Sequence, residues 1–102
     1  MIVINRFRVH PAERAGFENQ AQAAVDLLRT KPGLQSVDLV QNLDDEQLWA
    51  LVSRWENVGS YRRALGGFES KMTIVPLLSL SIDEPSAYDD SEEVGFNLPR
   101  NV

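Results

Sequence analysis

The stretch from Leu48 to Leu65, LWALVSRWENVGSYRRAL, constrains the fold more than any other part of the sequence. Its first half, up to Trp55, is an apolar run in which both alternating faces are largely hydrophobic. We therefore expect a strand over residues 47–55 that is buried on both sides. Asn57 is a good helix N-cap, because its side-chain oxygen can accept hydrogen bonds from the first turn. A short helix is predicted over residues 58–65, and it ends at Gly66-Gly67.

The N-terminal segment IVINRFRV, residues 2–9, has strand propensity throughout. Alternation places Asn5 between Val3 and Phe7 on one face of this strand. An amide among apolar neighbours needs a partner from the backbone, from water or from a ligand. The following His10-Pro11 pair ends the strand. An apolar stripe then predicts a helix to about Thr30, through Phe17, Ala21, Ala24, Val25 and Leu28.

The remaining elements complete a recognisable order. The turn Lys31-Pro32-Gly33 leads to a predicted strand at 34–42, and the polar residues 43–46 form a hairpin to the next strand. Residues 68–75 add one or two helical turns, and LLSLSI at 77–82 predicts a fourth strand. The order β–α–β–β–α–β indicates an α+β, ferredoxin-like fold, a four-stranded antiparallel sheet with helices on one face. Because the 47–55 strand is apolar on both faces, we expect a homodimer that packs sheet against sheet.

Length and charge bound the domain organisation and the partners. The chain has 102 residues, enough for one core, and we predict one domain over 1–82 with an acidic C-terminal extension over 83–102. Residues 1–82 hold nine acidic and nine basic side chains, so the extension carries the whole net charge of −5. Its Tyr88, Val94, Phe96 and Leu98 offer side chains that could dock it on the body or on a partner. Neither part presents a basic surface, which argues against nucleic-acid binding.

Features that the sequence lacks argue against other classes of protein. No apolar run approaches the ~18 residues of a membrane span, and the N-terminus does not follow a signal-peptide pattern. The chain has no cysteine, so it offers neither a disulfide nor a thiolate ligand. We therefore expect a cytoplasmic protein with no metal site and no membrane partner.

Three features resemble the antibiotic biosynthesis monooxygenase family of the dimeric α+β barrel superfamily. They are the first-strand Asn5, the turn at 31–33, and the Trp55-Glu56 pair followed by Tyr61, six residues after the tryptophan. The resemblance covers about residues 1–82. It implies a homodimer whose two sheets form a barrel, with a pocket between sheet and helices in each subunit.

Two chemistries are known in the family. Members that oxidise phenols without a cofactor use an asparagine, a tryptophan and a tyrosine. Trp55 and Tyr61 match the last two, but Leu51 stands where their asparagine lies, four residues before the tryptophan. Members that degrade haem share Asn5, but their iron-ligating histidine has no counterpart here. The single histidine, His10, belongs to the turn after the first strand, where we expect it to be exposed.

The resemblance therefore implies Asn5, Trp55 and Tyr61 as catalytic residues of a cofactor-independent monooxygenase. Its substrates would be a small electron-rich aromatic, a phenol or hydroquinone, and molecular oxygen. We expect apolar side chains to line the substrate pocket, namely Phe7, Phe17, Leu51 and Phe68. Whether the protein is an enzyme stays open. One alternative is a non-catalytic dimer that binds a small molecule or haem, and another is a structural dimer in which Trp55 is a core residue and Asn5 a structural amide.

Overall fold

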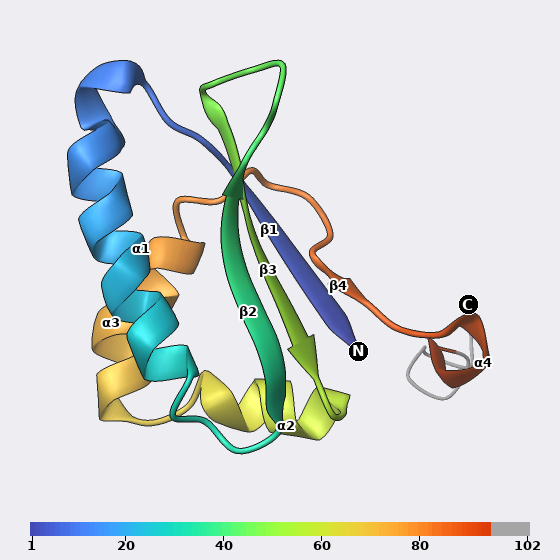
Figure 1. Cartoon of the computed structure of the whole chain (residues 1–102). Coiled ribbons are helices and arrows are strands. Elements are labelled where there is room, and N and C mark those ends of the chain that lie inside the picture. Colours follow the sequence, from blue (N-terminus) through green and yellow to red (C-terminus); the bar gives the residue numbers. More distant parts are fainter. Residues whose placement is uncertain (95–102) are drawn as a thin grey trace.

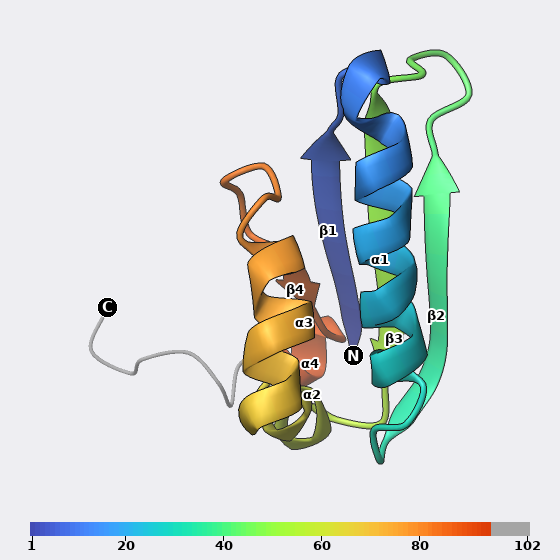
Figure 2. The same ribbon diagram turned by 90° about the vertical axis from the view of Figure 1, so that its left-hand side faces the viewer.

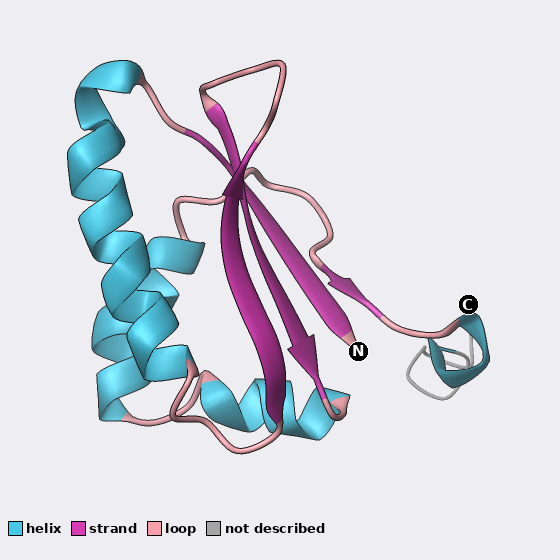
Figure 3. Ribbon diagram, in the orientation of Figure 1, coloured by secondary structure: helices cyan, strands magenta, loops and turns pink. Residues whose placement is uncertain are grey.

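The computed structural model describes residues 1–94 of the chain. Figure 1 shows a sheet on one side and helices on the other, and Figure 3 shows the same two layers by secondary structure. The long strands are β1 (Ile2–Arg8), β2 (Leu34–Gln41) and β3 (Leu48–Trp55). A 3-10 turn, η1 (Pro11–Glu13), leads into α1 (Arg14–Leu28), and the other helices are α2 (Val58–Ala64), α3 (Phe68–Leu78) and α4 (Ser91–Val94). The last strand, β4 (Ala87–Tyr88), has only two residues.

The sheet confirms the predicted α+β, ferredoxin-like fold. Its strand order is β2-β3-β1-β4, and every neighbouring pair is antiparallel. Asn5 of β1 lies opposite Leu51 of β3, which in turn lies opposite Leu39 of β2. Seen from the side, α1 and α3 run along the same face of the sheet (Figure 2). The predicted helices on one face are therefore present.

The predicted fourth strand at residues 77–82 is wrong. Leu77 continues the helical spacing from Ile74, and both side chains are fully buried in α3, so the apolar run extends the helix past Pro76. The chain then crosses to the sheet and pairs with the free edge of β1. The backbone N–H of Ile82 donates to Arg6 (2.7 Å). The true last strand begins at Ala87, within the segment predicted as an extension.

The core lies between the sheet and the two long helices. The predicted inward face of β1 is confirmed, since Val3, Asn5 and Phe7 are all at least nine-tenths buried. From α1, the predicted apolar stripe is buried in full, and its Ala21 and Ala24 have no exposed surface. Small side chains let α1 approach the sheet closely, so the room for a ligand between the layers depends on a few larger residues.

The opposite face of the sheet is only half-buried in the single chain. It carries alternate residues of β1 and β3 together with the 46% exposed Val40 of β2. The apolar members from β1 and β3 are Ile2, Ile4, Leu48, Ala50 and Val52. The strand β3 is therefore not buried on both sides within one chain, and its second face is open.

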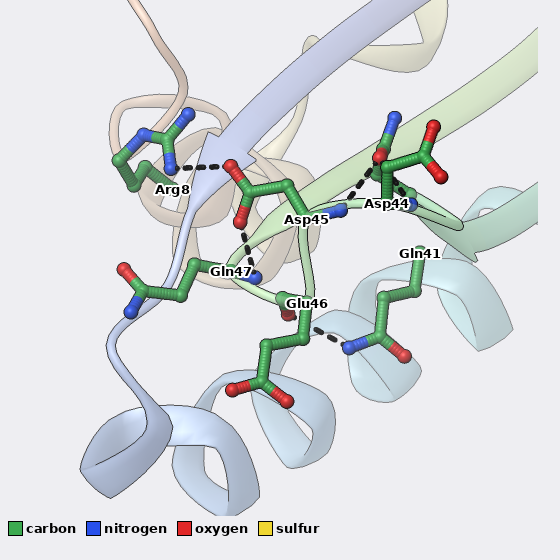
Figure 4. A network of polar contacts seen from close by, with 7 residues as sticks. Arg8, Gln41, Asp44, Asp45, Glu46 and Gln47 are labelled. Carbon is green, nitrogen blue, oxygen red and sulfur yellow. Dashed lines mark hydrogen bonds and ion pairs between the residues drawn. The ribbon is translucent and has the colours of Figure 1, made fainter.

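Two turns fix the ends of the sheet. In the β2–β3 hairpin, the Asn42 side chain accepts from the backbone N–H groups of Asp44 and Asp45, and Asp45 accepts from Arg8 (2.9 Å) and Gln47 (Figure 4). The Arg8 contact is the main reason that the pKa of Asp45 lies below its usual value. At the other end, Gly33 adopts a φ of +89°, and an added Cβ would overlap the Ser60 hydroxyl of α2. The predicted turn at 31–33 thus needs glycine for its conformation and for its packing.

Within residues 1–94, no helix is both long enough and apolar enough to cross a bilayer.

Candidate functional site

Asn5 occupies the middle of the buried sheet face. Its side chain is 7% exposed and lies between Val3 and Phe7, opposite Leu51. Within residues 1–94 its amide forms no hydrogen bond. Every buried side-chain nitrogen or oxygen within residues 1–94 has either a hydrogen-bond partner or some contact with solvent. The Asn5 amide therefore keeps a small accessible surface, where water or a ligand group can supply its hydrogen-bond partner.

A cleft of about 420 Å³ opens where β1 ends and α1 begins, and its nearest lining residue on the Asn5 face of β1 is Phe7. Two aromatic rings line it, those of Phe7 and Phe17, with centroids 5.1 Å apart, and Phe17 packs in turn against Trp49 outside the cleft, with centroids 5.6 Å apart. The volume falls in the range of small-molecule sites, and aromatic floors suit flat ring systems. We call this site the Phe7 cleft, and its lining residues are Phe7, Arg8, Val9, Ala12, Glu13, Gly16, Phe17, Gln20 and Leu80.

Trp55 lies at the other end of the same sheet face, four residues along β3 from Leu51. It is 1% exposed, and its indole N–H donates to the Ser53 hydroxyl (2.9 Å). The donor that the sequence suggested for a substrate is therefore already used within the chain. In this conformation Trp55 is a core residue, as one of the alternatives expected.

Tyr61 of α2 packs against Trp55, with ring centroids 5.7 Å apart. The side chain is about half-buried, and burial raises the pKa of its phenol. The phenol therefore stays protonated near neutral pH and remains a donor. Within residues 1–94 its hydroxyl forms no hydrogen bond. It borders a second cleft of about 320 Å³, beside Arg62 and Tyr88.

The structure thus divides the predicted site residues into two groups. Phe7 and Phe17 come together at one end of the sheet, Trp55 and Tyr61 come together at the other, and Asn5 lies between the two pairs. Leu51 is a core residue opposite Asn5 and borders neither cleft. Phe68 begins α3 and is 79% exposed, so it does not point into the interior of this chain. The catalytic and binding roles of all seven residues stay predictions.

Three site residues were missed by the sequence reasoning. Ser53 partners Trp55, and its place two residues earlier on the same strand face was a usable signal. Gly16 lies on α1 at the Phe7 cleft, where a Cβ would meet no atom within 4 Å. Leu80 lies on the cleft wall. The signal for Leu80 was hidden because residues 77–82 were assigned to a strand.

The residues do not fit a haem or a metal site. His10 is exposed and caps η1, with its Nδ1 accepting from the Ala12 N–H (3.1 Å), so it does not face the interior. The buried polar side chains of the described chain are one amide and three hydroxyls, which are poor ligands for haem iron. Within residues 1–94, no three histidine, cysteine, aspartate or glutamate side chains gather into a metal site.

Comparisons with known proteins agree with this fold. The sequence model of a family described as antibiotic biosynthesis monooxygenase matches residues 1–71. A solved mutant of SnoaB, described as a cofactor-independent oxygenase from Streptomyces nogalater, is 26% identical, with a TM-score of 0.68 over 79% of this chain and 82% of that one. A conserved protein from Methanosarcina mazei Go1 is 20% identical, with a TM-score of 0.70 over 84% of each chain. No curated protein matches the chain.

Proposed function

Since the chain belongs to the antibiotic biosynthesis monooxygenase family, we propose that it oxidises a small electron-rich aromatic, a phenol or hydroquinone, with molecular oxygen and no cofactor. The observation that carries the proposal is that Phe7 of the aromatic cleft and the buried Asn5, whose amide has no hydrogen-bond partner within residues 1–94, lie on the same face of β1. The similarity to SnoaB supports the reaction class.

In this proposal the Phe7 cleft and the Asn5 amide have different roles. Phe7 and Phe17 hold the flat substrate ring by stacking, and Asn5 orients the substrate oxygen that becomes negatively charged when the substrate ionises, before the ring gives electrons to oxygen. The dry surroundings strengthen that hydrogen bond. One oxygen atom enters the ring to form a quinone, and the other leaves as water.

A general base is missing from the interior. The buried polar side chains of the described residues are Asn5, Ser53, Ser60 and Ser70, none of which takes a proton near neutral pH. The carboxylate that lines the Phe7 cleft, Glu13, is exposed, so the proposal favours substrates that ionise readily by themselves, such as anthrones and hydroquinones. Trp55 and Tyr61 act in this proposal from the far end of the sheet. There the Tyr61 phenol is a free donor, and Trp55 reaches a ligand only if its bond to Ser53 opens.

The open sheet face supports a homodimer as the working form, in a cytoplasmic setting. Its apolar centre has Val52 opposite Ile4, and arginines stand among these residues. A second copy would remove this surface from water, which favours association. We expect Val52→Arg to give monomers in sedimentation velocity with the far-UV circular dichroism unchanged. An unchanged sedimentation coefficient would exclude this face as the interface.

Oxygen uptake tests the function directly. We expect purified protein with chelator and no added flavin to consume oxygen with anthrone or naphthalene-1,4-diol above the rate of the substrate alone. Asn5→Leu is expected to lower kcat/KM by about a hundredfold, the usual effect of losing one preorganised donor. The control is Leu43→Ala, because Leu43 is fully exposed in the hairpin.

Two results would contradict the proposal. Binding of these aromatics without oxygen uptake would favour the non-catalytic binding dimer, which the occupied Trp55 donor also suits. Equal rates for the wild type and Asn5→Leu would remove Asn5 from the site.

A further inference from the structure

The segment after α3 contributes one residue, Leu80, to the Phe7 cleft. Figure 1 shows residues 79–86, which we call the crossing segment, passing in orange from the helix layer over to the edge of the sheet. Leu80 of this segment lines the cleft together with Phe7 and Phe17. It is 58% exposed, so it forms the outer part of the wall. The shape of the cleft thus depends on how the crossing segment is held.

Two backbone hydrogen bonds attach this segment to β1. The backbone N–H of Ile82 donates to the backbone carbonyl of Arg6, and the backbone N–H of Ile4 donates to the backbone carbonyl of Ser86, both at 2.7 Å. Regular pairing with β4 begins only beyond them, at Val3. The crossing segment is therefore joined to the sheet more loosely than a full strand would be.

One ion pair completes the attachment. Arg6 donates from Nε to Glu84 Oε1 (2.8 Å) and from Nη2 to Oε2 (3.1 Å), a two-point contact. Arg6 faces away from the cleft, because alternation along β1 sends Asn5 and Phe7 to the opposite side. The two side chains are 43% and 28% exposed, so water competes for this contact and it can open reversibly.

We propose that Leu80 is a movable wall of the Phe7 cleft, held closed by the Arg6–Glu84 pair, and that it sets the size of the aromatic that the cleft admits. The inference rests on the proposed function for the nature of the ligand. Arg6 and Glu84 are then positioning residues, since they act through Leu80 and do not touch the ligand. Opening the pair lets a longer ring system enter the Phe7 cleft, and closing it narrows the cleft.

Two variants and two matched controls test this proposal. Leu80→Ala shortens the wall, and Glu84→Ala removes the clamp while leaving the wall intact. Leu43→Ala removes an exposed leucine elsewhere, and Glu18→Ala removes another exposed arginine–glutamate pair, the contact of Arg14 with Glu18. The probes are 1-naphthol with two rings and 1-hydroxyanthraquinone with three, measured by quenching of tryptophan fluorescence.

We expect Leu80→Ala to improve binding of the three-ring probe relative to the two-ring probe by about tenfold. Glu84→Ala should speed hydrogen exchange at the Ile82 amide by about two- to fivefold, the effect of losing one exposed ion pair, and should raise the three-ring association rate. The control variants should change none of these quantities. Arg6→Lys keeps the charge but not the two-point contact, so it should fall between the wild type and Glu84→Ala.

The proposal would be overturned if the three-ring preference stayed the same in Leu80→Ala, or if neither probe bound any variant. It would also fail if Ile82 exchanged at the wild-type rate in Glu84→Ala. These readouts need no turnover, so they separate the two proposals. A changed size preference without oxygen uptake would support Leu80 as the movable wall and contradict the oxygenase proposal. Oxygen uptake with an unchanged size preference would contradict the movable wall alone.

Discussion

Replacing Asn5 by leucine should make the protein more stable while it loses activity. The Asn5 amide is 93% buried and has no hydrogen-bond partner within residues 1–94. An amide in this situation costs about 1–3 kcal/mol relative to one that is hydrogen-bonded. Leucine removes this penalty, because two methyl groups take the place of the amide oxygen and nitrogen. We expect a net gain of about 1–2 kcal/mol, because part of the benefit is spent on fitting the larger side chain.

Urea denaturation followed by tryptophan fluorescence measures this change. A gain of this size raises the midpoint at an unchanged slope, and it raises Tm by roughly 4–8 °C for each kcal/mol in a domain near this size. All variants should be compared at one protein concentration, since a dimer adds a concentration-dependent part to the stability.

Ser70→Ala is the matched control for the Asn5 variant. Ser70 is completely buried, but its hydroxyl donates to the Ala64 carbonyl (2.7 Å), so its removal should destabilise the protein by about 1 kcal/mol. The reasoning would be refuted if Asn5→Leu lowered the stability by a similar amount. That result would mean that the amide has a structural partner or that no space lies beside it.

Three further predictions follow from the same contacts. Gly33→Ala should destabilise the chain by about 2–4 kcal/mol, because Gly33 has a positive φ and an added Cβ would overlap the Ser60 hydroxyl. Gly16→Ala should stabilise the chain by about 0.5–1 kcal/mol, because Gly16 lies in the helix α1 and an added Cβ would meet no atom within 4 Å. Equal effects of the two variants in urea titrations would contradict both predictions. Ser53→Ala should cost about 1–3 kcal/mol, because it leaves the buried Trp55 N–H without a partner, and an unchanged midpoint would show that this donor finds another acceptor. The pKa of Tyr61 is raised by burial, so the unfolded chain loses its phenol proton first and stability should fall as the pH rises above about 10; Tyr61→Phe should remove that part of the fall, and identical pH profiles for the two proteins would contradict the burial effect.

The long elements could be predicted because their side-chain spacing is unambiguous. In α1 the apolar residues recur at helical intervals over four turns, and in β1 alternation alone places Asn5 and Phe7 on the buried face. The fourth strand could not be found in this way. The run at 77–82 alternates like a strand, but Leu77 also continues the helical spacing from Ile74. Burial of both side chains in the core stabilises the helix. The actual strand, Ala87–Tyr88, is too short to carry any pattern.

The candidate site could be predicted only in part, because side-chain contacts between different elements leave no pattern in the sequence. A pattern can show that Asn5 faces the core, but only the structure shows that no group of residues 1–94 bonds its amide. The contact of Phe7 with Phe17 joins a strand to a helix, and its geometry depends on how closely the alanines of α1 approach the sheet. The family resemblance pointed to Trp55 as a donor, and the Ser53 hydroxyl that occupies it was overlooked in that comparison.

The most direct test of the central claim is an isotope experiment with anthrone under ¹⁸O₂, in the presence of a chelator and without flavin or haem. Our account predicts anthraquinone that carries one ¹⁸O atom at the newly oxidised carbon, formed much faster with wild-type protein than with Asn5→Leu. Product that carries no ¹⁸O from the gas, or labelled product formed equally fast with Asn5→Leu or with anthrone alone, would contradict a cofactor-independent oxygenase that acts through the Asn5 amide.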